Sequence, residues 1–300
     1  MPPSPSRRLL RSVLFTPASQ PARMRKALLS KADAVVLDLE DAVAPHDKDA
    51  ARAHVVALLH DLASTTVPRS VPTVCVRINC VSSTRWGGHD LQALAPLTHF
   101  DALLLPKVED ATRVQAALDT LERHQPFDLS VPPKALWCMV ETARGVQRAD
   151  RIADLDGVAA LIFGSNDLTK DLKARHTASR EPLLYAMSQV VCAARAAGKQ
   201  AVDGVHLDIA DAEGIARACR QGRDLGFDGK SLIHPSQIDP ANAGFGPAPE
   251  EVIAAYEGQG KAGPGVIAVD GQMVEALHVE QAKLLVAEAE EIARLEQSRI

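Results

Sequence analysis

Short aliphatic runs alternate with helix-length amphipathic stretches from residue 13 to about residue 242, and this alternation constrains the fold more than any other feature. Between the runs, apolar residues recur three and four positions apart, which is typical of helices with one buried face. The strand candidates are Val13–Thr16, Ala34–Leu39, Thr73–Ile78, Ala102–Pro106, Ala135–Val140, Ala159–Phe163, Ala201–Val205 and Lys230–Ile233. The clearest helix candidates are Ala22–Ser30, Lys48–Leu62, Ala111–Arg123, Pro182–Ala197 and Ala212–Gln221. Such repeats predict parallel strands joined by helical crossovers.

We predict an α/β fold in which the eight strands close into a (β/α)8 TIM barrel. Parallel strands bury both faces, and closure also removes both sheet edges. The alternative is an open, doubly wound sheet. That fold ordinarily carries a Gly-rich phosphate-binding turn after its first strand, whereas the segment Thr16–Gln20 lacks one.

The pattern changes after residue 242. Gly244–Pro249 has the composition of a turn, Glu250–Glu257 of a short helix, Gly258–Gly265 of a flexible loop and Met273–Gln297 of a long helix. We therefore predict a catalytic barrel over residues 1–245. Residues 246–300 are predicted to form a C-terminal helical arm or lid that also serves oligomerisation.

Charge and cysteine usage indicate a cytoplasmic protein that binds neither nucleic acid nor membranes. The formal net charge is −5, and no apolar stretch reaches about 18 residues. The five cysteines are scattered through apolar segments without metal-ligand spacing, as in a reduced core. Residues 1–32 are locally basic and contain no acidic residue, which also resembles a transit peptide. The strand candidate that starts at Val13 leaves little room for such a leader.

Ionisable and polar residues follow seven of the predicted strands. In a barrel the carboxyl ends of all strands meet at one mouth, so we expect these residues to converge there. They are Asp38–Asp41, Arg77–Asn79, Lys107–Glu109, Glu141–Thr142, Asn166–Asp167, Asp203 and His234. Any one of them could instead cap a helix. Buried together, the carboxylates require neutralisation by a cation or by opposite charges.

Glu141 and Asp167 are the candidate metal ligands, because they end adjacent strands and have no cysteine or paired histidine nearby. Oxygen donors of this kind favour Mg²⁺, with Mn²⁺ as a substitute, over zinc. Arg77 is a planar donor suited to a carboxylate or an enolate oxygen. Lys107 and Lys230 are alternatives for Schiff-base chemistry, but surrounding carboxylates would hold both protonated.

Several ordered motifs resemble the citrate lyase beta-subunit-like enzymes of the HpcH/HpaI aldolase superfamily, which include malyl-CoA and citramalyl-CoA lyases. The matching segments span about residues 12–245. They are Ser12–Pro17, Ala34–Val43, Val76–Asn79, Leu105–Glu109, Val140–Gly145, Phe163–Leu168 and Gly226–Ile238, with a weaker match at Val269–Glu275. The resemblance implies that Glu141 and Asp167 bind Mg²⁺ and that Arg77 contacts the keto acid and the thioester oxygen. It also implies that Glu40 and Asp41 flank the metal through water and substrate.

The C-terminal match departs from the family pattern. Such lyases tend to read Asp-Gly-Lys-Met-Ile/Val-Asp, with an acidic residue proposed as general acid/base, whereas this chain reads Asp270-Gly-Gln-Met-Val-Glu275. Asp270 and Glu275 are therefore candidate proton donors, although Glu275 could simply favour a helix N-terminus. The resemblance further implies a homotrimer or hexamer in which this segment closes over a neighbour's site.

The first functional hypothesis is a Mg²⁺-dependent lyase that cleaves or forms a 3-hydroxyacyl-CoA such as malyl-CoA or citramalyl-CoA, with acetyl-CoA and a 2-keto acid as the other partners. Arg23 and Lys26, from the basic N-terminal run, are candidates for contacting the CoA phosphates. The second hypothesis is a thioesterase on the same site, and the third is a non-catalytic barrel subunit or binding module. The sequence leaves open which acyl-CoA is used and whether an acyl-carrier protein replaces CoA.

Overall fold

The computed structural model describes residues 9–64, 72–124 and 134–247. Beyond these it describes residues 253, 254, 257, 267–269, 272–274 and 276–298. Contacts divide the chain into two compact units, Met1–Asn242 and Ala243–Ile300. Among the described residues no helix is both long enough and apolar enough to cross a membrane.

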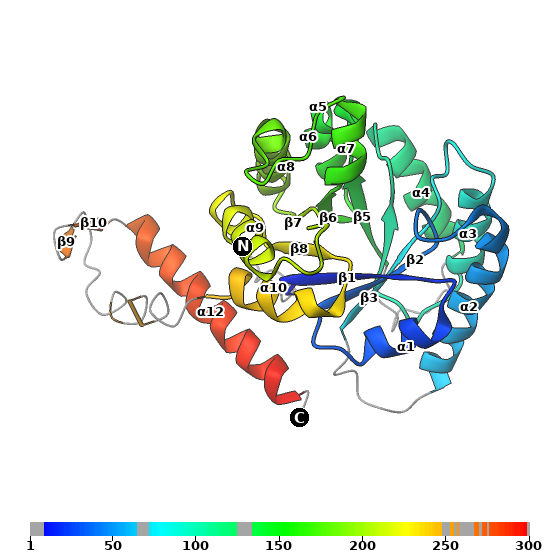
Figure 1. Ribbon diagram of the computed structural model, residues 1–300, viewed down its shortest axis with the longest axis horizontal. Helices are drawn as coiled ribbons and strands as arrows, with labels where there is room; N and C mark the ends of the chain where they lie inside the picture. The colour runs from blue at the N-terminus through cyan, green and yellow to red at the C-terminus, as the bar shows by residue number, and fades with distance from the viewer. Residues whose placement is uncertain are drawn as a thin grey trace. The chain divides into compact units, whose positions relative to one another are not determined.

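The first unit contains a closed barrel in which each strand pairs with the next along the chain and β8 pairs with β1 (Figure 1). All eight pairings are parallel. The strands are β1 (Ser12–Pro17), β2 (Ala34–Asp38), β3 (Thr73–Arg77), β4 (Ala102–Leu105), β5 (Ala135–Val140), β6 (Val158–Phe163), β7 (Gln200–Asp203) and β8 (Gly229–Leu232). The predicted TIM barrel is thus confirmed, and the open-sheet alternative is wrong.

Helices surround these strands (Figure 1). They are α1 (Pro21–Leu28), α2 (Lys48–Ser64), α3 (Trp86–Leu94), α4 (Ala111–His124), α5 (Ala143–Gln147), α6 (Ala149–Ala153), α7 (Ser165–Asp171), α8 (Leu184–Ala196), α9 (Ala212–Asp224) and α10 (Ile238–Phe245), with 3₁₀ turns at Pro45–Asp47, Glu181–Leu183 and Pro235–Gln237. Periodicity found the long helices. The helices α3, α5, α6, α7 and α10 were not among the named candidates, and each is only five to nine residues long, which gives an apolar repeat little room to show.

Alternate residues of the strands form the core inside the barrel. Ala34 and Val36 of β2, for example, belong to the same buried cluster, while the alternating residues Val35 and Leu37 are buried outside that cluster. The period of two is the strand geometry that places successive side chains on opposite faces. The cluster consists of Leu10, Val13, Ala34, Val36, Cys75, Ala102, Leu104, Trp137, Met139, Ala160, Ile162 and Val202.

The second unit contains an antiparallel pair, β9 (Ile267–Val269) and β10 (Gln272–Val274), and the helix α12 (Ala276–Ser298). The predicted start of the long helix at Met273 is wrong, because Met273 pairs with Ala268 in the two-stranded sheet. Most of the predicted turn, short helix and loop between residues 248 and 265 lies outside the described residues. The function of this unit as an arm or lid stays a prediction.

Barrel closure depends on the absence of a side chain at Gly229, the first residue of β8. A Cβ atom there would lie 1.7 Å from the main-chain oxygen of Leu10. The next residue, Lys230, donates its main-chain N–H to the oxygen of Arg11 at 3.0 Å. The backbones of β8 and of the segment that enters β1 therefore meet without room for a methyl group.

We expect Gly229→Ala to lower the free energy of unfolding by about 3 kcal/mol or more, because backbone rather than a flexible side chain must move. Urea denaturation followed by circular dichroism measures the change. Gly88→Ala is the matched control: a Cβ there has no atom within 4 Å, and the residue lies in α3. We expect that control to be neutral or slightly stabilising, and equal midpoints for the two variants would contradict the argument.

Candidate active site

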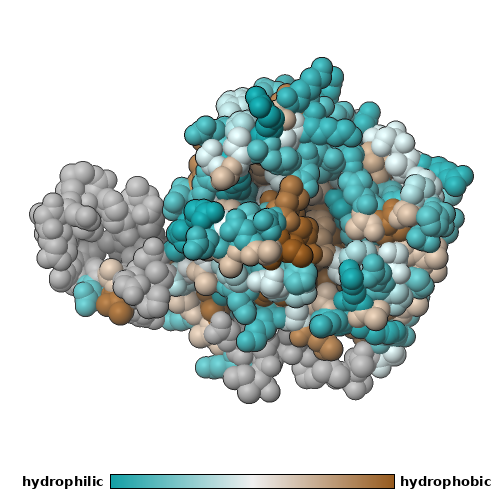
Figure 2. Space-filling model, viewed as in Figure 1, coloured by the Kyte–Doolittle hydropathy of each residue, from teal (hydrophilic) through white to brown (hydrophobic). Residues whose placement is uncertain are grey.

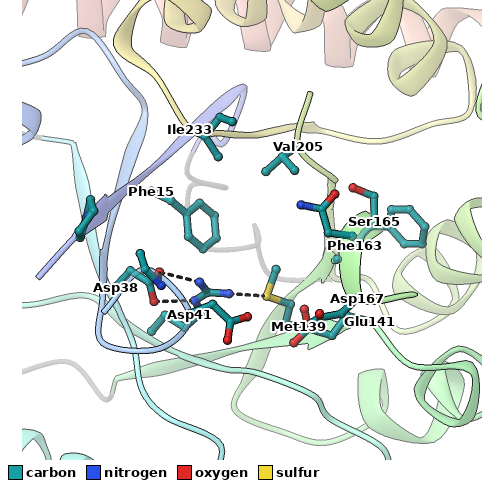
Figure 3. Close-up of a pocket in the computed structure, with 15 residues that line it drawn as sticks. Phe15, Asp38, Asp41, Met139, Glu141, Phe163, Ser165, Asp167, Val205 and Ile233 are labelled. Atoms are coloured by element: carbon teal, nitrogen blue, oxygen red, sulfur yellow. Dashed lines mark hydrogen bonds and ion pairs between the residues drawn. The ribbon is translucent and has the colours of Figure 1, made fainter. Parts of the chain in front are cut away.

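A pocket of about 340 Å³ lies where the strands of the barrel end. Its lining divides into a group of charged side chains and a group of apolar ones, and Figure 3 shows Phe15, Val205 and Ile233 apart from Asp41, Glu141 and Asp167. On the face seen in Figure 2, apolar residues also gather beside a central hollow. The lining residues are Phe15, Pro17, Asp38, Asp41, Ala42, Arg77, Met139, Glu141, Phe163, Gly164, Ser165, Asn166, Asp167, Val205 and Ile233.

Arg77 is fixed in this pocket by Asp38. The last residues of β2 and β3 stand side by side in register, and the guanidinium donates Nε to Asp38 Oδ1 at 2.7 Å and Nη2 to Oδ2 at 2.6 Å. Burial raises the pKa of Asp38, but the charge and hydrogen bonds of Arg77 outweigh it and hold the pKa below its ordinary value. This bidentate pair leaves Nη1 directed at Met139 Sδ, 3.6 Å away, and at Glu40 Oε2, 3.0 Å away.

The sequence placed Asp38 at a strand end but did not assign it a role. The signal was present, because an acid and an arginine end neighbouring predicted strands at equivalent positions. Parallel pairing of those strands brings the two side chains together. Asp38 is therefore a positioning residue for Arg77.

Glu40 and Asp41 share a cation with Asp167. The ammonium of Lys107 contacts Glu40 Oε1, lies 3.1 Å from Asp167 Oδ2 and lies 3.3 Å from Asp41 Oδ2. Burial lowers the pKa of Lys107, but the hydrogen bond and charge of Glu40 outweigh it, so the pKa lies above its ordinary value. The Schiff-base alternative is disfavoured for Lys107, since the amine stays protonated.

Glu141 is the more deeply buried of the two candidate metal ligands. It accepts a hydrogen bond from the main-chain N–H of Lys107 at 2.8 Å and packs on Gly164, where a Cβ atom would lie 2.5 Å from Oε2. Burial and then the charge of Glu40 raise the pKa of Glu141 to about 8, although Arg77 and Lys107 oppose them. A nearby cation stabilises the ionised form of such a buried carboxylate.

Asp167 lies in the first turn of α7, and its side chain is 31% exposed. It lines the same pocket as Glu141 and Arg77, and Figure 3 draws the Asp167 and Glu141 side chains beside each other. The two candidate ligands therefore do not lie at opposite ends of the fold. Their role as ligands stays a prediction.

The donor set suits a hard divalent cation that brings its own water and substrate ligands. Among the described residues no three His, Cys, Asp or Glu side chains form a ready metal cage. Mg²⁺ in proteins is commonly held by only one or two carboxylates, with the other positions filled by water and substrate. Glu40 Oε2 is buried and forms an ion pair with Arg77 Nη1 without hydrogen-bond geometry, so it could also accept from a bound water. These residues fit Mg²⁺.

The other predicted site residues stand as follows. Arg23 and Lys26 are exposed on α1, and their contact with CoA stays a prediction. Asp270 and Glu275 lie outside the described residues. Arg11, one member of the basic N-terminal run, is not available to an anion, because it is buried and donates to both oxygens of Asp33.

The expectation that all strand-end residues converge is wrong in part. Asn79 donates to Asp90, His234 is exposed and bonds Ser236, and Glu109 lies 3.9 Å from Arg144. These side chains satisfy local partners and do not line the pocket. Convergence of strand ends thus brings backbone positions together, but the local hydrogen bonds decide which side chains enter the pocket.

Asp203 and Lys230 form a separate buried ion pair. Lys230 Nζ lies 2.7 Å from Asp203 Oδ2, and Arg180 Nη1 binds the same carboxylate at 2.6 Å. Lys230 is the second residue of β8 rather than its end, and it is fully buried. Burial lowers its pKa, and the charge of Asp203 opposes that shift. A substrate carbonyl still has no access to it.

A closed parallel barrel that gathers an arginine and several carboxylates at the carboxyl ends of its strands defines a TIM-barrel enzyme. The family model described as HpcH/HpaI aldolase/citrate lyase matches residues 11–235. The chain belongs to this family.

The similarity of this chain to known relatives extends over nearly its whole length. A (3S)-malyl-CoA thioesterase of Cereibacter sphaeroides is 40% identical over 289 residues, covering 94% of this chain and 95% of that protein. The mitochondrial citramalyl-CoA lyase of Rattus norvegicus is 32% identical over 301 residues, covering 94% and 86%. The crystal structure of CitE from Mycobacterium tuberculosis with magnesium, acetoacetate and coenzyme A aligns with a TM-score of 0.77 and 32% identity, covering 95% of this chain and 99% of that one.

We expect Asp38→Asn to destabilise the protein by roughly 3 kcal/mol at pH 7, because it removes the carboxylate that binds the buried guanidinium of Arg77 through two hydrogen bonds. The wild-type pair stabilises the fold above the ordinary pKa of an aspartate, and that stability is lost as the pH falls through the lowered pKa of Asp38. The difference between variant and wild type should therefore shrink towards acidic pH. Urea unfolding at several pH values measures this.

Asp61→Asn is the control for that experiment. Asp61 binds Arg25 at 2.8 Å with both side chains more than half exposed. Solvent screens such a pair, so we expect a change within about 0.5 kcal/mol. A loss for Asp38→Asn no larger than that of the control would refute the positioning role.

Proposed function

We propose that this protein is a Mg²⁺-dependent enzyme that hydrolyses a malyl-CoA-like thioester to the free hydroxy acid and CoA. The observation that carries the proposal is the 40% identity, over 94% of the chain, to a (3S)-malyl-CoA thioesterase. From the sequence motifs alone, carbon–carbon cleavage was the first functional hypothesis and thioester hydrolysis the second. The relatives favour hydrolysis over cleavage, so hydrolysis becomes the first candidate.

Glu141 and Asp167 would hold the metal. When bound, Mg²⁺ supplies Lewis-acid polarisation of a substrate oxygen and balances the charge of the substrate carboxylate. The main-chain N–H of Lys107 fixes the orientation of the Glu141 carboxylate by donating to Oε1. Magnesium and coenzyme A are both present in the CitE complex from Mycobacterium tuberculosis, which supports the same requirement here.

Arg77 would stabilise charge that develops on the thioester oxygen. Its guanidinium lines the pocket, and Asp38 holds it rigidly through two hydrogen bonds. A donor that is already oriented need not reorganise when the oxygen becomes negative, and this is the usual advantage of an oxyanion site. Burial in the pocket strengthens the interaction because little water screens it.

Asp41 is our candidate for the general base. It lines the pocket, and its side chain is 59% exposed, so water can reach it. In the hydrolytic step, a water proton would pass to Asp41 while the water oxygen bonds to the thioester carbon. The carbon–sulfur bond then breaks, and the proton leaves with the CoA thiolate as free thiol.

Carbon–carbon cleavage is the second candidate. The 32% identity to the citramalyl-CoA lyase of Rattus norvegicus favours it. In that reaction malyl-CoA gives acetyl-CoA and glyoxylate, and Arg77 would stabilise the enolate of the departing thioester. Asp270 or Glu275 would deliver the proton to the enolate carbon, and each keeps that role as a prediction.

Assembly and compartment also remain predictions. A homotrimer or hexamer, in which the segment with Asp270 and Glu275 covers a neighbouring pocket, would explain how water access is controlled. Light scattering on the purified chain measures the oligomer. A cytoplasmic location and the choice of CoA over an acyl-carrier protein likewise await direct tests. A non-catalytic barrel is disfavoured by the charged pocket, and failure to bind Mg²⁺ would support it.

We expect the wild-type protein to release free CoA and malate from (3S)-malyl-CoA with Mg²⁺ and to lose turnover in EDTA. Chromatography of the products separates the two candidates, because the lyase yields acetyl-CoA and glyoxylate instead. Glu141→Gln removes a proposed ligand charge, so turnover should fall by more than roughly 100-fold.

Glu109→Gln is the matched control, since Glu109 follows β4 but does not line the pocket. We expect it to retain wild-type turnover and the same products. Full turnover in EDTA, or equal turnover in the two variants, would disprove the metal-dependent scheme. Acetyl-CoA and glyoxylate as products would replace hydrolysis by the second candidate.

A further inference from the structure

Lys107 contacts both carboxylates of the proposed metal site with different parts of the same residue. Its main-chain N–H donates to Glu141 Oε1 at 2.8 Å, and its ammonium lies 3.1 Å from Asp167 Oδ2. The ammonium also contacts Glu40 and lies 3.3 Å from Asp41. One residue thus reaches four carboxylates that come from three different segments of the chain.

The backbone of Lys107 is left-handed, with φ of 51°. Among the described residues only Lys107, Lys173 and Arg180 are non-glycine residues with positive φ, and Lys107 is the one that contacts the proposed metal ligands. This conformation is disfavoured for a residue with a Cβ atom, so it persists where surrounding contacts hold it. The contacts of its N–H and ammonium supply that constraint.

The ammonium and a divalent cation would draw on the same oxygen atoms. Mg²⁺ binds carboxylate oxygens directly, and an ammonium within hydrogen-bond distance of Asp167 competes for that charge. The lysine side chain is 32% exposed and the side chain of Asp41 is more exposed still. The ammonium can therefore turn towards Asp41 and solvent when a divalent cation binds Asp167. The four-carbon stem makes this movement compatible with a fixed backbone.

We infer that Lys107 is a positioning residue that sets the metal affinity of this site: its main chain orients Glu141 as a ligand, while its ammonium occupies Asp167 until a divalent cation displaces it. This inference rests on the proposed function, in which Glu141 and Asp167 hold the metal. It goes beyond that function because it assigns the ammonium of Lys107 as the cation that balances the site's carboxylates in the metal-free protein.

Three substitutions at this position test the inference, and all keep the main-chain N–H. Lys107→Asn removes the charge with a residue that tolerates a left-handed backbone, and Lys107→Gly removes it with no conformational strain. Lys107→Arg keeps the charge. Lys170→Gln is the matched control, because Lys170 is exposed on α7, the helix that carries Asp167.

Binding of Mn²⁺ alone is titrated by the EPR signal of the free ion, and thermal melting is recorded in EDTA. We expect Lys107→Asn and Lys107→Gly to bind Mn²⁺ about tenfold more tightly than wild type, as removal of one competing charge allows. Both should melt at lower temperature in EDTA, because the carboxylates lose their cation. Lys107→Arg and Lys170→Gln should stay near wild type in affinity.

A residue that serves only the structure would lower the melting temperature and weaken metal binding together, so tighter binding separates the two roles. Wild-type or weaker affinity in both Lys107→Asn and Lys107→Gly would overturn the inference while leaving the metal site intact. Absence of Mn²⁺ binding in the wild-type protein would overturn the proposed metal site and this inference with it. Circular dichroism verifies that each variant is folded.

Discussion

The site depends on confining many negative charges at one end of the barrel. The carboxylates of Asp38, Glu40, Asp41 and Asp167 form ion pairs with Arg77 or Lys107, and Glu141 accepts a hydrogen bond from the main chain of Lys107. Arg77 binds Asp38 with two hydrogen bonds and also contacts Glu40, while Glu40, Asp41 and Asp167 share the ammonium of Lys107. Burial and then the charge of Glu40 raise the pKa of Glu141, and the excess of negative charge makes the pocket a place where a divalent cation is stabilised.

The barrel supplies the rigidity that such a charge cluster needs. Neighbouring strands fix Asp38 opposite Arg77 through their register, and the tight approach at Gly229 closes the sheet. Charged groups that repel each other remain close only where the backbone cannot relax away from them. The stability of the closed barrel and the electrostatic character of its mouth are therefore coupled.

Sequence reasoning found the fold because its signal is repeated and long. All eight predicted strands overlap the observed ones, since buried parallel strands read as uninterrupted aliphatic runs. The gathering of Arg77, Glu141 and Asp167 in one pocket followed from strand-end positions. The exclusion of Asn79 and His234 did not, because hydrogen bonds to Asp90 and Ser236 depend on rotamers and loop paths that no periodic pattern encodes. The same limit applies to the left-handed backbone at Lys107.

The buried cluster of Arg180, Asp203 and Lys230 gives the barrel a second ionic centre, formed by β7, β8 and the segment between β6 and β7. Its members satisfy one another and are closed to solvent or nearly so. This cluster is therefore separate from the pocket that contains Arg77, Glu141 and Asp167. Divergence of the reactive half towards a new acyl group can then proceed without disturbing the ionic bonds that hold the other half of the barrel together.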